Sequence, residues 1–521
     1  MPNGATEQAT LPGLLPQPGG FDPGEALLQA DPAENPQPQG YCRFHPRGTG
    51  TAVLAERYSV PARARATKKR ELMGARGRRQ FGYLAASALG LAALLLALPA
   101  GAGAEQAASK AHRAAAGRLA AGARFSCAII RGGAVRCWGI NDSGQLGYGN
   151  TRDIGDNETP ASAGPVDLGG HKAVAIAAGF YHACALLDNG WVRCWGQGSA
   201  GQLGYGNTNN IGDDETPAAA GPVDLGGKAV AITAGGFHTC AILDNGRVRC
   251  WGLNWRGELG VGNTNNIGVY ETPASVAPVN LGRKAVAITA GGSHTCAILD
   301  NGQVRCWGLN NFGQLGYGNT RDIGDNEAPA SVAPVKLGKG RKAVAITGAY
   351  RHTCALLDNR SVRCWGVAGS GQLGYGNKQK IGDNESPASV RPVKLANSRR
   401  AGRAVVISAS GSHTCAVISR GKVRCWGTGN FGQLGYGNTR DIGDNETPAS
   451  VGPVRIGKGR KAIAVTTGGR QTCALLDTGR VRCWGLGVNG QLGYGIKRDI
   501  GDNEFPGSVG PVKLGGKVVT H

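Results

Sequence analysis

The sequence lacks the usual signatures of an enzyme. No Gly-rich loop follows a strand and opens a helix, which argues against the common phosphate-binding motifs. No stretch combines a nucleophile, a base and a group that orients the base, and each polar feature recurs in several copies, whereas an active site should break the symmetry. The cysteines lack the close Cys-x2-Cys spacing of zinc sites. We therefore predict a protein that is not an enzyme, with no cofactor and no bound metal.

Methionine is nearly absent, with Met1 and Met73 as the two copies in 521 residues. Residues 1–72 are rich in Pro, Gly and Ala without lasting periodicity, so we predict an extension that is disordered or not translated. Residues 73–104 begin with a charged stretch, continue with the apolar run 82–98 and end in Ala-Gly-Ala. These are the three parts of a secretory signal, and we predict that translation starts at Met73.

The signal-like apolar segment predicts export of the mature chain. We place the cleavage after Ala104, with an Ala-rich linker at 105–118. Arg78 and Arg79 resemble a twin-arginine export signal, and no cysteine follows the cleavage point, which argues against a lipoprotein. An uncleaved membrane anchor is the open alternative, because the run is near the lower length limit for a spanning helix. The predicted location is periplasmic, cell-surface or extracellular.

Cysteine is the abundant feature. Fourteen of the fifteen cysteines form seven pairs with nine residues between the partners, and Trp-Gly follows each second cysteine. The tryptophans recur every 56 to 61 residues, a period that indicates a propeller or an array. We predict disulfides in an oxidising compartment, with reduced buried thiols and metal sites as alternatives. The predicted pairs are Cys127 with Cys137, Cys184 with Cys194, Cys240 with Cys250, Cys296 with Cys306, Cys354 with Cys364, Cys415 with Cys425 and Cys473 with Cys483.

Each pair lies in a predicted β-hairpin. In the fourth copy, two short apolar runs flank the turn 300–302, whose last residue is a glycine that takes positive φ easily. A three-residue turn pairs Leu299 with Gln303 and places Cys296 directly opposite Cys306, within disulfide range. Trp307 then falls on the other face of the hairpin, so both faces carry apolar groups, as expected of a sheet packed between two neighbours.

The whole repeat predicts an all-β fold. In the fourth unit an alternating strand at 285–289 precedes the hairpin, and a polar loop follows it. A fourth strand is expected around residues 334–337. Seven such units predict a seven-bladed β-propeller of four-stranded blades over residues 119–521.

The repeat resembles that of the regulator of chromosome condensation family. The resemblance rests on His294-Thr-Cys-Ala-Ile-Leu-Asp-Asn-Gly, on Val-Arg-Cys-Trp-Gly308, on Gly-Gln-Leu-Gly316 and on the later Pro334-Val, and it covers about residues 114–521. It implies a seven-bladed propeller that closes by pairing strands from the two ends of the chain. The C-terminal residues 517–521 match the start of the inner strand and are expected to supply the closing strand.

The resemblance leaves function open. The eukaryotic founder is similar to a nucleotide-exchange factor for a small nuclear GTPase that docks on chromatin, whereas other members resemble secreted binders, including an inhibitor of β-lactamase. This chain departs from the founder in its cysteine pairs, its export-like start and its acidic loops. No motif matches the founder's exchange residues, so none is carried over. Because one fold can carry several functions, the function must be inferred from the residues of the site.

Two recurring polar features have structural interpretations. The loop Asp322-Ile-Gly-Asp325-Asn-Glu327 recurs in several units and reads as a turn in which Asp and Asn bond their own backbone, with a calcium site as the alternative. The second feature is a histidine that recurs two residues before the first cysteine of five units. We interpret it as structural histidine, because one unit has Phe125 there. Its members are His182, His238, His294, His352 and His413.

The departures from symmetry lie between Trp-Gly and Gly-Gln-Leu-Gly. Equivalent loops of a propeller emerge on one face, and aromatic and arginine side chains are typical interface anchors. We predict that Trp255, Arg256, Phe312 and Phe431 bind a protein or glycan partner. The alternative is that these loops are tolerant turns with some aromatic rings tucked between blades.

The charge is strongly basic, with 57 Lys and Arg against 35 Asp and Glu. Because positive residues recur in every repeat, we expect a distributed, solvated charge and no nucleic-acid partner. We predict an exported binding scaffold, stapled by disulfides, that presents loops on one face. The competing hypothesis is an intracellular regulator related to nucleotide-exchange factors or chromatin-associated proteins, and a membrane contact is expected only through an uncleaved anchor.

Overall fold

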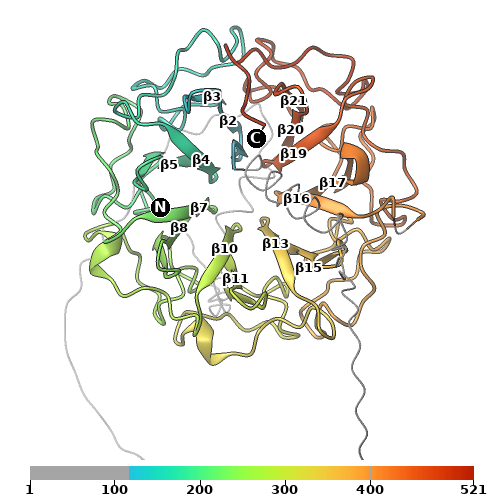
Figure 1. Ribbon diagram of the computed structural model, residues 1–521, viewed down its shortest axis with the longest axis horizontal. Helices are drawn as coiled ribbons and strands as arrows, with labels where there is room; N and C mark the ends of the chain where they lie inside the picture. The colour runs from blue at the N-terminus through green and yellow to red at the C-terminus, as the bar shows by residue number, and fades with distance from the viewer. Residues whose placement is uncertain (1–116, 399, 521) are drawn as a thin grey trace, which may run out of the picture. The chain divides into compact units, whose positions relative to one another are not determined.

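The computed structural model describes residues 117–398 and 400–520, which form seven three-stranded antiparallel sheets. Figure 1 shows these sheets arranged around a common centre, with the first and last blades side by side. The predicted seven-bladed all-β propeller is confirmed. The predicted extension and the apolar run 82–98 lie outside the described residues. Within the described ranges, no helix has the length and hydrophobicity needed to cross a membrane.

The blades follow one another along the chain. Blades one to four are β1 (Leu119–Ala121), β2 (Phe125–Ile129), β3 (Val135–Gly139); β4 (Ala173–Ala178), β5 (His182–Leu187), β6 (Val192–Gly196); β7 (Ala229–Ala234), β8 (His238–Leu243), β9 (Val248–Gly252); and β10 (Ala285–Ala290), β11 (His294–Leu299), β12 (Val304–Gly308). Blades five to seven are β13 (Ala343–Gly348), β14 (His352–Leu357), β15 (Val362–Gly366); β16 (Ala404–Ser410), β17 (His413–Ile418), β18 (Lys422–Gly427); and β19 (Ala462–Thr467), β20 (Gln471–Leu476), β21 (Val481–Gly485). Three short 3-10 turns complete the described elements: η1 (Pro273–Ser275), η2 (Pro329–Ser331) and η3 (Ser419–Gly421).

The cysteine hairpin has the predicted register. In blade four, Cys296 lies opposite Cys306, and Ile298 lies opposite Val304. Every residue of β11 is buried, because its two faces pack against the neighbouring blades. The disulfide therefore cross-links the hairpin inside the core.

All seven predicted cysteine pairs form disulfides, with Cα atoms 4.0 to 4.1 Å apart. Each bond joins the second strand of a blade to the third, so the alternatives of free thiols and metal sites do not describe these hairpins. The bonds link Cys127 to Cys137, Cys184 to Cys194, Cys240 to Cys250, Cys296 to Cys306, Cys354 to Cys364, Cys415 to Cys425 and Cys473 to Cys483.

The predicted fourth strand is present only as a short attached segment. In blade four the Val335 amide donates to the Val304 carbonyl at 2.9 Å, and the equivalent bond occurs in the other blades. The preceding Pro334 has no N–H to donate, so the segment cannot extend into a regular ladder. The prediction of four-stranded blades was wrong in this respect: the blades are three-stranded sheets to which the segment around 334–337 adds a few contacts.

Adjacent blades are joined by buried side chains. The Trp307 indole is fully buried and donates to the Glu258 carbonyl of the preceding blade at 2.9 Å. A Cβ atom at Gly260 would lie 2.7 Å from that indole nitrogen, which explains the last glycine of the Gly-Gln-Leu-Gly motif. His294 reaches the other way, and its Nε2 lies 2.8 Å from the Thr353 hydroxyl of the next blade.

The two ends of the chain close the ring within blade one. Val518 pairs with Ile130, and the Lys517 carbonyl accepts a bond from the Arg131 amide at 2.8 Å. The strand β1, from the N-terminal end of the propeller, pairs with β2 and forms the inner strand of the same blade. The prediction that the C-terminus takes part in ring closure is confirmed, but it adds a single bridge at Val518, and the inner strand of blade one is β1.

Candidate partner-binding face

Each blade presents two opposite ends. One end carries the three-residue hairpin turns, such as 300–302 in blade four, and we call this the hairpin face. The other end carries the inner turns before each histidine and the loops after Trp-Gly. A bond from the Leu309 amide to the Ser293 carbonyl, at 2.8 Å, holds these two segments together. We call this second surface the loop face.

Trp255 and Tyr270 are the most exposed aromatic side chains of the loop face, with exposed fractions of 62% and 91%. Both line a hollow of about 690 Å³ together with Asn263 and Asn265. The hollow combines two aromatic anchors with amide side chains that can donate and accept hydrogen bonds. Sequence reasoning selected Trp255 and missed Tyr270, although Val269 and Tyr270 visibly replace the Asp and Asn that the repeat has at 325 and 326.

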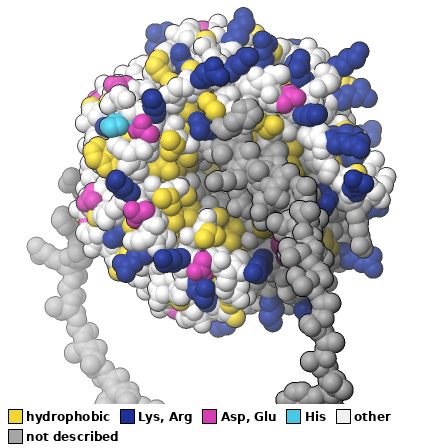
Figure 2. Space-filling view, viewed as in Figure 1, with side chains coloured by type: hydrophobic (Ala, Val, Ile, Leu, Met, Phe, Trp, Pro, Cys, Tyr) yellow, Lys and Arg dark blue, Asp and Glu magenta, His cyan; other side chains and the backbone are white. Residues whose placement is uncertain are grey.

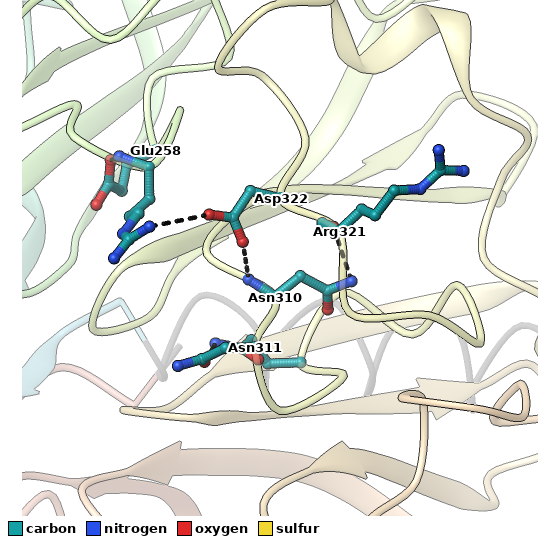
Figure 3. Close-up of polar contacts among 7 residues, drawn as sticks. Glu258, Asn310, Asn311, Arg321 and Asp322 are labelled. Atoms are coloured by element: carbon teal, nitrogen blue, oxygen red, sulfur yellow. Dashed lines mark hydrogen bonds and ion pairs between the residues drawn. The ribbon is translucent and has the colours of Figure 1, made fainter. Parts of the chain in front are cut away.

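Arg256 follows Trp255 in the chain but lines a separate hollow together with Asp322 of blade four, which orients it. Its guanidinium lies 3.8 Å from the Asp322 carboxylate, whose other oxygen accepts a bond from the Asn310 amide at 2.7 Å. The Asn310 side chain in turn donates to the Arg321 carbonyl at 2.9 Å. Figure 3 shows Asp322 and Asn310 facing each other within this network. The predicted site residue thus links two blades and keeps an exposed, partly paired charge.

Phe312 and Phe431 are half-buried beneath cationic side chains. The Arg351 guanidinium lies 4.8 Å from the centre of the Phe312 ring, and the Lys380 ammonium lies 5.4 Å from it. Arg470 covers Phe431 in the same way at 4.8 Å. Such cation–π contacts fix the rings and leave the charged groups at the surface. These two phenylalanines therefore support cationic groups of the face, whereas Trp255 is itself exposed.

Three further aromatic rings meet at the centre of the ring and were missed by sequence reasoning. Phe180 lies 5.8 Å from Phe237 and 5.8 Å from Tyr350, measured between ring centres. Arg351 stacks on Tyr350 as well as on Phe312, so contacts run from the centre of the face to blade four. The signal was a set of aromatic residues in the inner turns, just before the histidine series.

Glu258 replaces the glutamine of the Gly-Gln-Leu-Gly motif in blade three. Burial raises the pKa of its carboxyl group to about 7, and the hydrogen bond from the Arg256 amide opposes this shift. In blade four the equivalent Gln314 amide lies 3.4 Å from the side-chain carbonyl oxygen of Asn311. Blade three has Trp255 at the position of Asn311 and so offers no such acceptor.

The recurring polar loops use their first aspartate to hold the backbone. The Asp322 carboxylate accepts the Asn310 amide, and Asp153, Asp441 and Asp499 accept the amides of Asn141, Gly429 and Gly487 at 2.8 to 2.9 Å. Burial raises the pKa of Asp322 despite this bond. The first aspartate therefore holds the loop after Trp-Gly, whereas the predicted bonding within the loop itself is made by residues such as Asp156, which accepts the Asn157 amide at 3.0 Å.

The histidine series is structural, as predicted. Each ring is fully or almost fully buried, and each Nε2 lies 2.8 to 2.9 Å from a threonine hydroxyl of the next blade. Burial lowers the pKa of His294 to about 4 and that of the other four to about 3, which keeps the rings neutral.

The exposed cations are not spread evenly over the ring, in contrast to the expectation from the repeats. They gather on the rim and hairpin face of blades four to seven, and Figure 2 shows Lys and Arg side chains crowding one side of the molecule. We call this set the basic arc. It consists of Lys336, Lys339, Arg341, Lys342, Lys394, Arg400, Arg455, Lys458, Arg460, Lys461, Lys513 and Lys517.

The repeats match the family model for the regulator of chromosome condensation (RCC1) repeat at residues 132–186, 189–242, 245–298, 301–356, 361–417 and 420–475. The chain belongs to this family. It is 31% identical over 408 residues to the Ultraviolet-B receptor UVR8 of Arabidopsis thaliana, covering 77% of this chain and 83% of the receptor. It is 29% identical over 383 residues to the Regulator of chromosome condensation of Xenopus laevis, covering 71% of this chain and 83% of that protein.

Solved RCC1 propellers have the same fold. The structure of Kap60 bound to yeast RCC1 (Prp20) contains a chain that matches with a TM-score of 0.57 and 18% identity, over 77% of this chain and 86% of that one. Human WBSCR16 matches with a TM-score of 0.56 and 19% identity, over 72% and 92%. At this level of identity, the likeness establishes the fold.

Proposed function

We propose that this RCC1 propeller is an exported, non-enzymatic scaffold that binds a protein partner through its loop face. The observation that carries the proposal is the hollow between Trp255 and Tyr270, two large rings that a monomer would otherwise leave in water. Exposed aromatic side chains around a polar hollow are typical interface anchors, and Arg256, which follows Trp255 and lines the neighbouring hollow, adds a charged contact. Blade four has an equivalent hollow of about 730 Å³, in which Asn311 and Asn326 occupy the positions of Trp255 and Tyr270. The pair of exposed aromatic rings, rather than the hollow itself, therefore distinguishes blade three.

The disulfides support a location outside the reducing cytoplasm. Seven cross-links inside the hairpins persist in oxidising compartments and are rare where thiols are kept reduced. They also favour binding by preorganisation. A scaffold in which each blade is cross-linked internally loses little conformational entropy on association. A small set of anchor residues is then sufficient for useful affinity.

A protein partner agrees with what is known of related propellers. One matched structure describes the binding properties of yeast Prp20p to Gsp1p and histones, and another contains Kap60 bound to Prp20. These are properties of those proteins, and they support the general proposal that an RCC1 ring serves as a protein-binding surface.

The proposal is tested by cross-linking from the hollow. A photo-reactive benzoylphenylalanine is introduced at Asn263, which lines the hollow, in the full chain expressed in its own cells. We expect one discrete adduct that disappears when Trp255 and Tyr270 are both changed to Ala. Trp191, 47% exposed at a hairpin turn on the opposite face, provides the matched control, and Trp191→Ala should leave the adduct intact. An adduct that survives the double substitution in the folded protein would refute the proposal.

The intracellular regulator is the second candidate, and the names of the relatives favour it. The Regulator of chromosome condensation of Xenopus laevis is such a relative. The two candidates differ in the state of the cysteines, because a regulator in a reducing compartment would carry fourteen free thiols in these hairpins. Fractionation of cells that produce the protein, followed by thiol labelling, separates them.

A further inference from the structure

One exposed position of the repeat is Asp or Asn in the first three copies and Lys or Arg in the last four. In the Pro-Val-x-Leu segment the variable residue lies between two buried side chains and points outward. It is Asp167, Asp224 and Asn280 after the first three blades, and all three are exposed. It is Lys336, Lys394, Arg455 and Lys513 after the last four, all exposed as well. In the first three copies this side chain accepts a hydrogen bond from the glycine amide two residues on, at 2.9 to 3.1 Å, and so stabilises the turn. Lys and Arg have no acceptor for such a bond, so stabilisation of the turn does not explain the basic residues of the last four copies.

The loops that connect one blade to the next add further positive charge to the same half of the ring. After blade four, Lys339, Arg341 and Lys342 follow Lys336 within a few residues, and blades five and six also carry longer basic loops. After blades two and three the same connection is short and contains Lys228, or Arg283 and Lys284. Arg341 pairs with Asp358 at 3.2 Å, and this carboxylate offsets only part of the local charge. The second half of the ring therefore carries more exposed basic residues at these connections than the first half.

The arc contains a hollow of about 650 Å³ at blade four. Lys336, Lys339, Arg341 and Lys342 line it together with Asn301 and Gln303 of the hairpin turn. Such a volume accommodates a small ring-shaped group. Ammonium and guanidinium groups recognise carboxylate or sulfate substituents, and amide side chains hydrogen-bond to hydroxyl groups.

We propose that the basic arc binds an anionic polysaccharide, a polymer of sugar rings that carry carboxylate or sulfate groups. The chain lies along the rim of blades four to seven, and one anionic sugar occupies the hollow beside Asn301 and Gln303. Nucleic acid fits this surface less well, because the large exposed hydrophobic residues of the described chain include no aromatic side chain from the arc on which bases would stack. The site lies away from the loop face and does not depend on the partner proposed there.

The test measures binding of the purified full chain to heparin, a sulfated polymer, and to alginate, a polyuronate, with neutral dextran as the blank. Lys336, Lys394 and Lys513 are all changed to Asp, a residue that the same position already holds in two other copies. We expect affinity for both polymers to fall at least about ten-fold, with a shallower dependence of affinity on salt. A second variant with Gln at the three positions should show a smaller loss and covers the case in which the Asp variant fails to fold.

A matched control separates this site from the overall charge. Changing Arg152, Arg321 and Arg440 to Asp removes the same charge from exposed positions of the polar loops. This control should retain affinity within about two-fold, because exposed charges beyond a screening length of about 10 Å act weakly. Equal losses in both variants, no binding to either polymer at low salt, or much tighter binding of duplex DNA than of both polysaccharides would each overturn the proposal.

Discussion

The Nε2 atom of His294 lies 2.8 Å from the hydroxyl oxygen of Thr353, and this contact joins blade four to blade five inside the core. The Thr353 hydroxyl donates onward to the Gln314 carbonyl at 2.9 Å. The same side-chain pairing links most neighbouring blades. In blade seven the glutamine Gln471 takes the place of histidine and donates to the Gly122 carbonyl of blade one at 3.2 Å. The ring thus closes through a chain of buried polar contacts.

Replacing His294 by Ala should therefore destabilise the propeller. The substitution leaves a cavity and removes the partner of a buried hydroxyl, effects that together cost about 2–3 kcal/mol. His294→Gln should cost less, because Gln471 shows that an amide fits this position. Urea unfolding with the disulfides intact measures both values. Equal losses in the two variants would contradict the hydrogen-bonding role.

The buried histidines should also make stability depend on pH. Their pKa is about 3 to 4 in the folded protein and near 6.5 in the unfolded chain, so below pH 6.5 the unfolded state binds more protons. Stability should thus fall as pH drops from about 6.5 to 4, by at most about 1.4 kcal/mol per pH unit for each histidine. A His182→Gln/His294→Gln variant should show a flatter profile in urea unfolding between pH 7 and pH 4.5. An unchanged slope would contradict this explanation.

Glu258 should act in the opposite direction. Its pKa of about 7 lies above the usual value near 4.5, so its contribution to stability is lost as pH rises from about 4.5 through 7. Glu258→Gln should therefore stabilise the protein by about 1–3 kcal/mol at pH 8 and change little at pH 4.5. Gln314→Glu provides the reverse substitution in the next blade and should destabilise at pH 8. Thermal unfolding at the two pH values measures both, and a gain from Glu258→Gln that is equal at both would refute the assignment.

Two hairpin turns carry a non-glycine residue with positive φ, Arg360 in blade five and Arg420, with a φ of 68°, in blade six. Arg360 has a φ of 67° where the turn of blade four has Gly302. A side chain in this left-handed region costs about 1–2 kcal/mol, and the extra freedom of glycine in the unfolded chain offsets part of this cost. Arg360→Gly should thus stabilise the protein by about 0.5–1 kcal/mol, whereas Gly302→Ala should destabilise it. The denaturant midpoints of the two variants measure these effects. If Arg360→Gly destabilises the protein, the side chain of Arg360 contributes more stability than its left-handed backbone conformation costs.

The hairpins were predictable because their determinants are local. The spacing of Cys296 and Cys306 and the glycine at 302 fix the turn and the register, and the alternation of apolar residues fixes both faces. The fourth strand was overestimated, since its apolar pattern looks like a strand while Pro334 removes one ladder bond. Ring closure was predicted from the match of the C-terminal segment to the inner strand.

The candidate site was only partly predictable. Trp255 stood out because it breaks the repeat in a loop that must be exposed, and Tyr270 breaks a different loop of the same blade. Their common hollow depends on how the two loops fold back, which sequence does not show. The contact between Phe180 and Tyr350 joins blades two and five across the centre, so it depends on the curvature of the closed ring.

Peptide mapping of the protein isolated from its own cells, under non-reducing conditions after thiol alkylation, tests the central claim most directly. It reports the N-terminus and the state of the fourteen hairpin cysteines together. The account of a disulfide-stapled, exported scaffold predicts a chain that begins at Glu105 and seven linked peptides, each joining the two cysteines of one hairpin. Alkylated cysteines in the hairpins of a chain that retains residues 73–104 would contradict it.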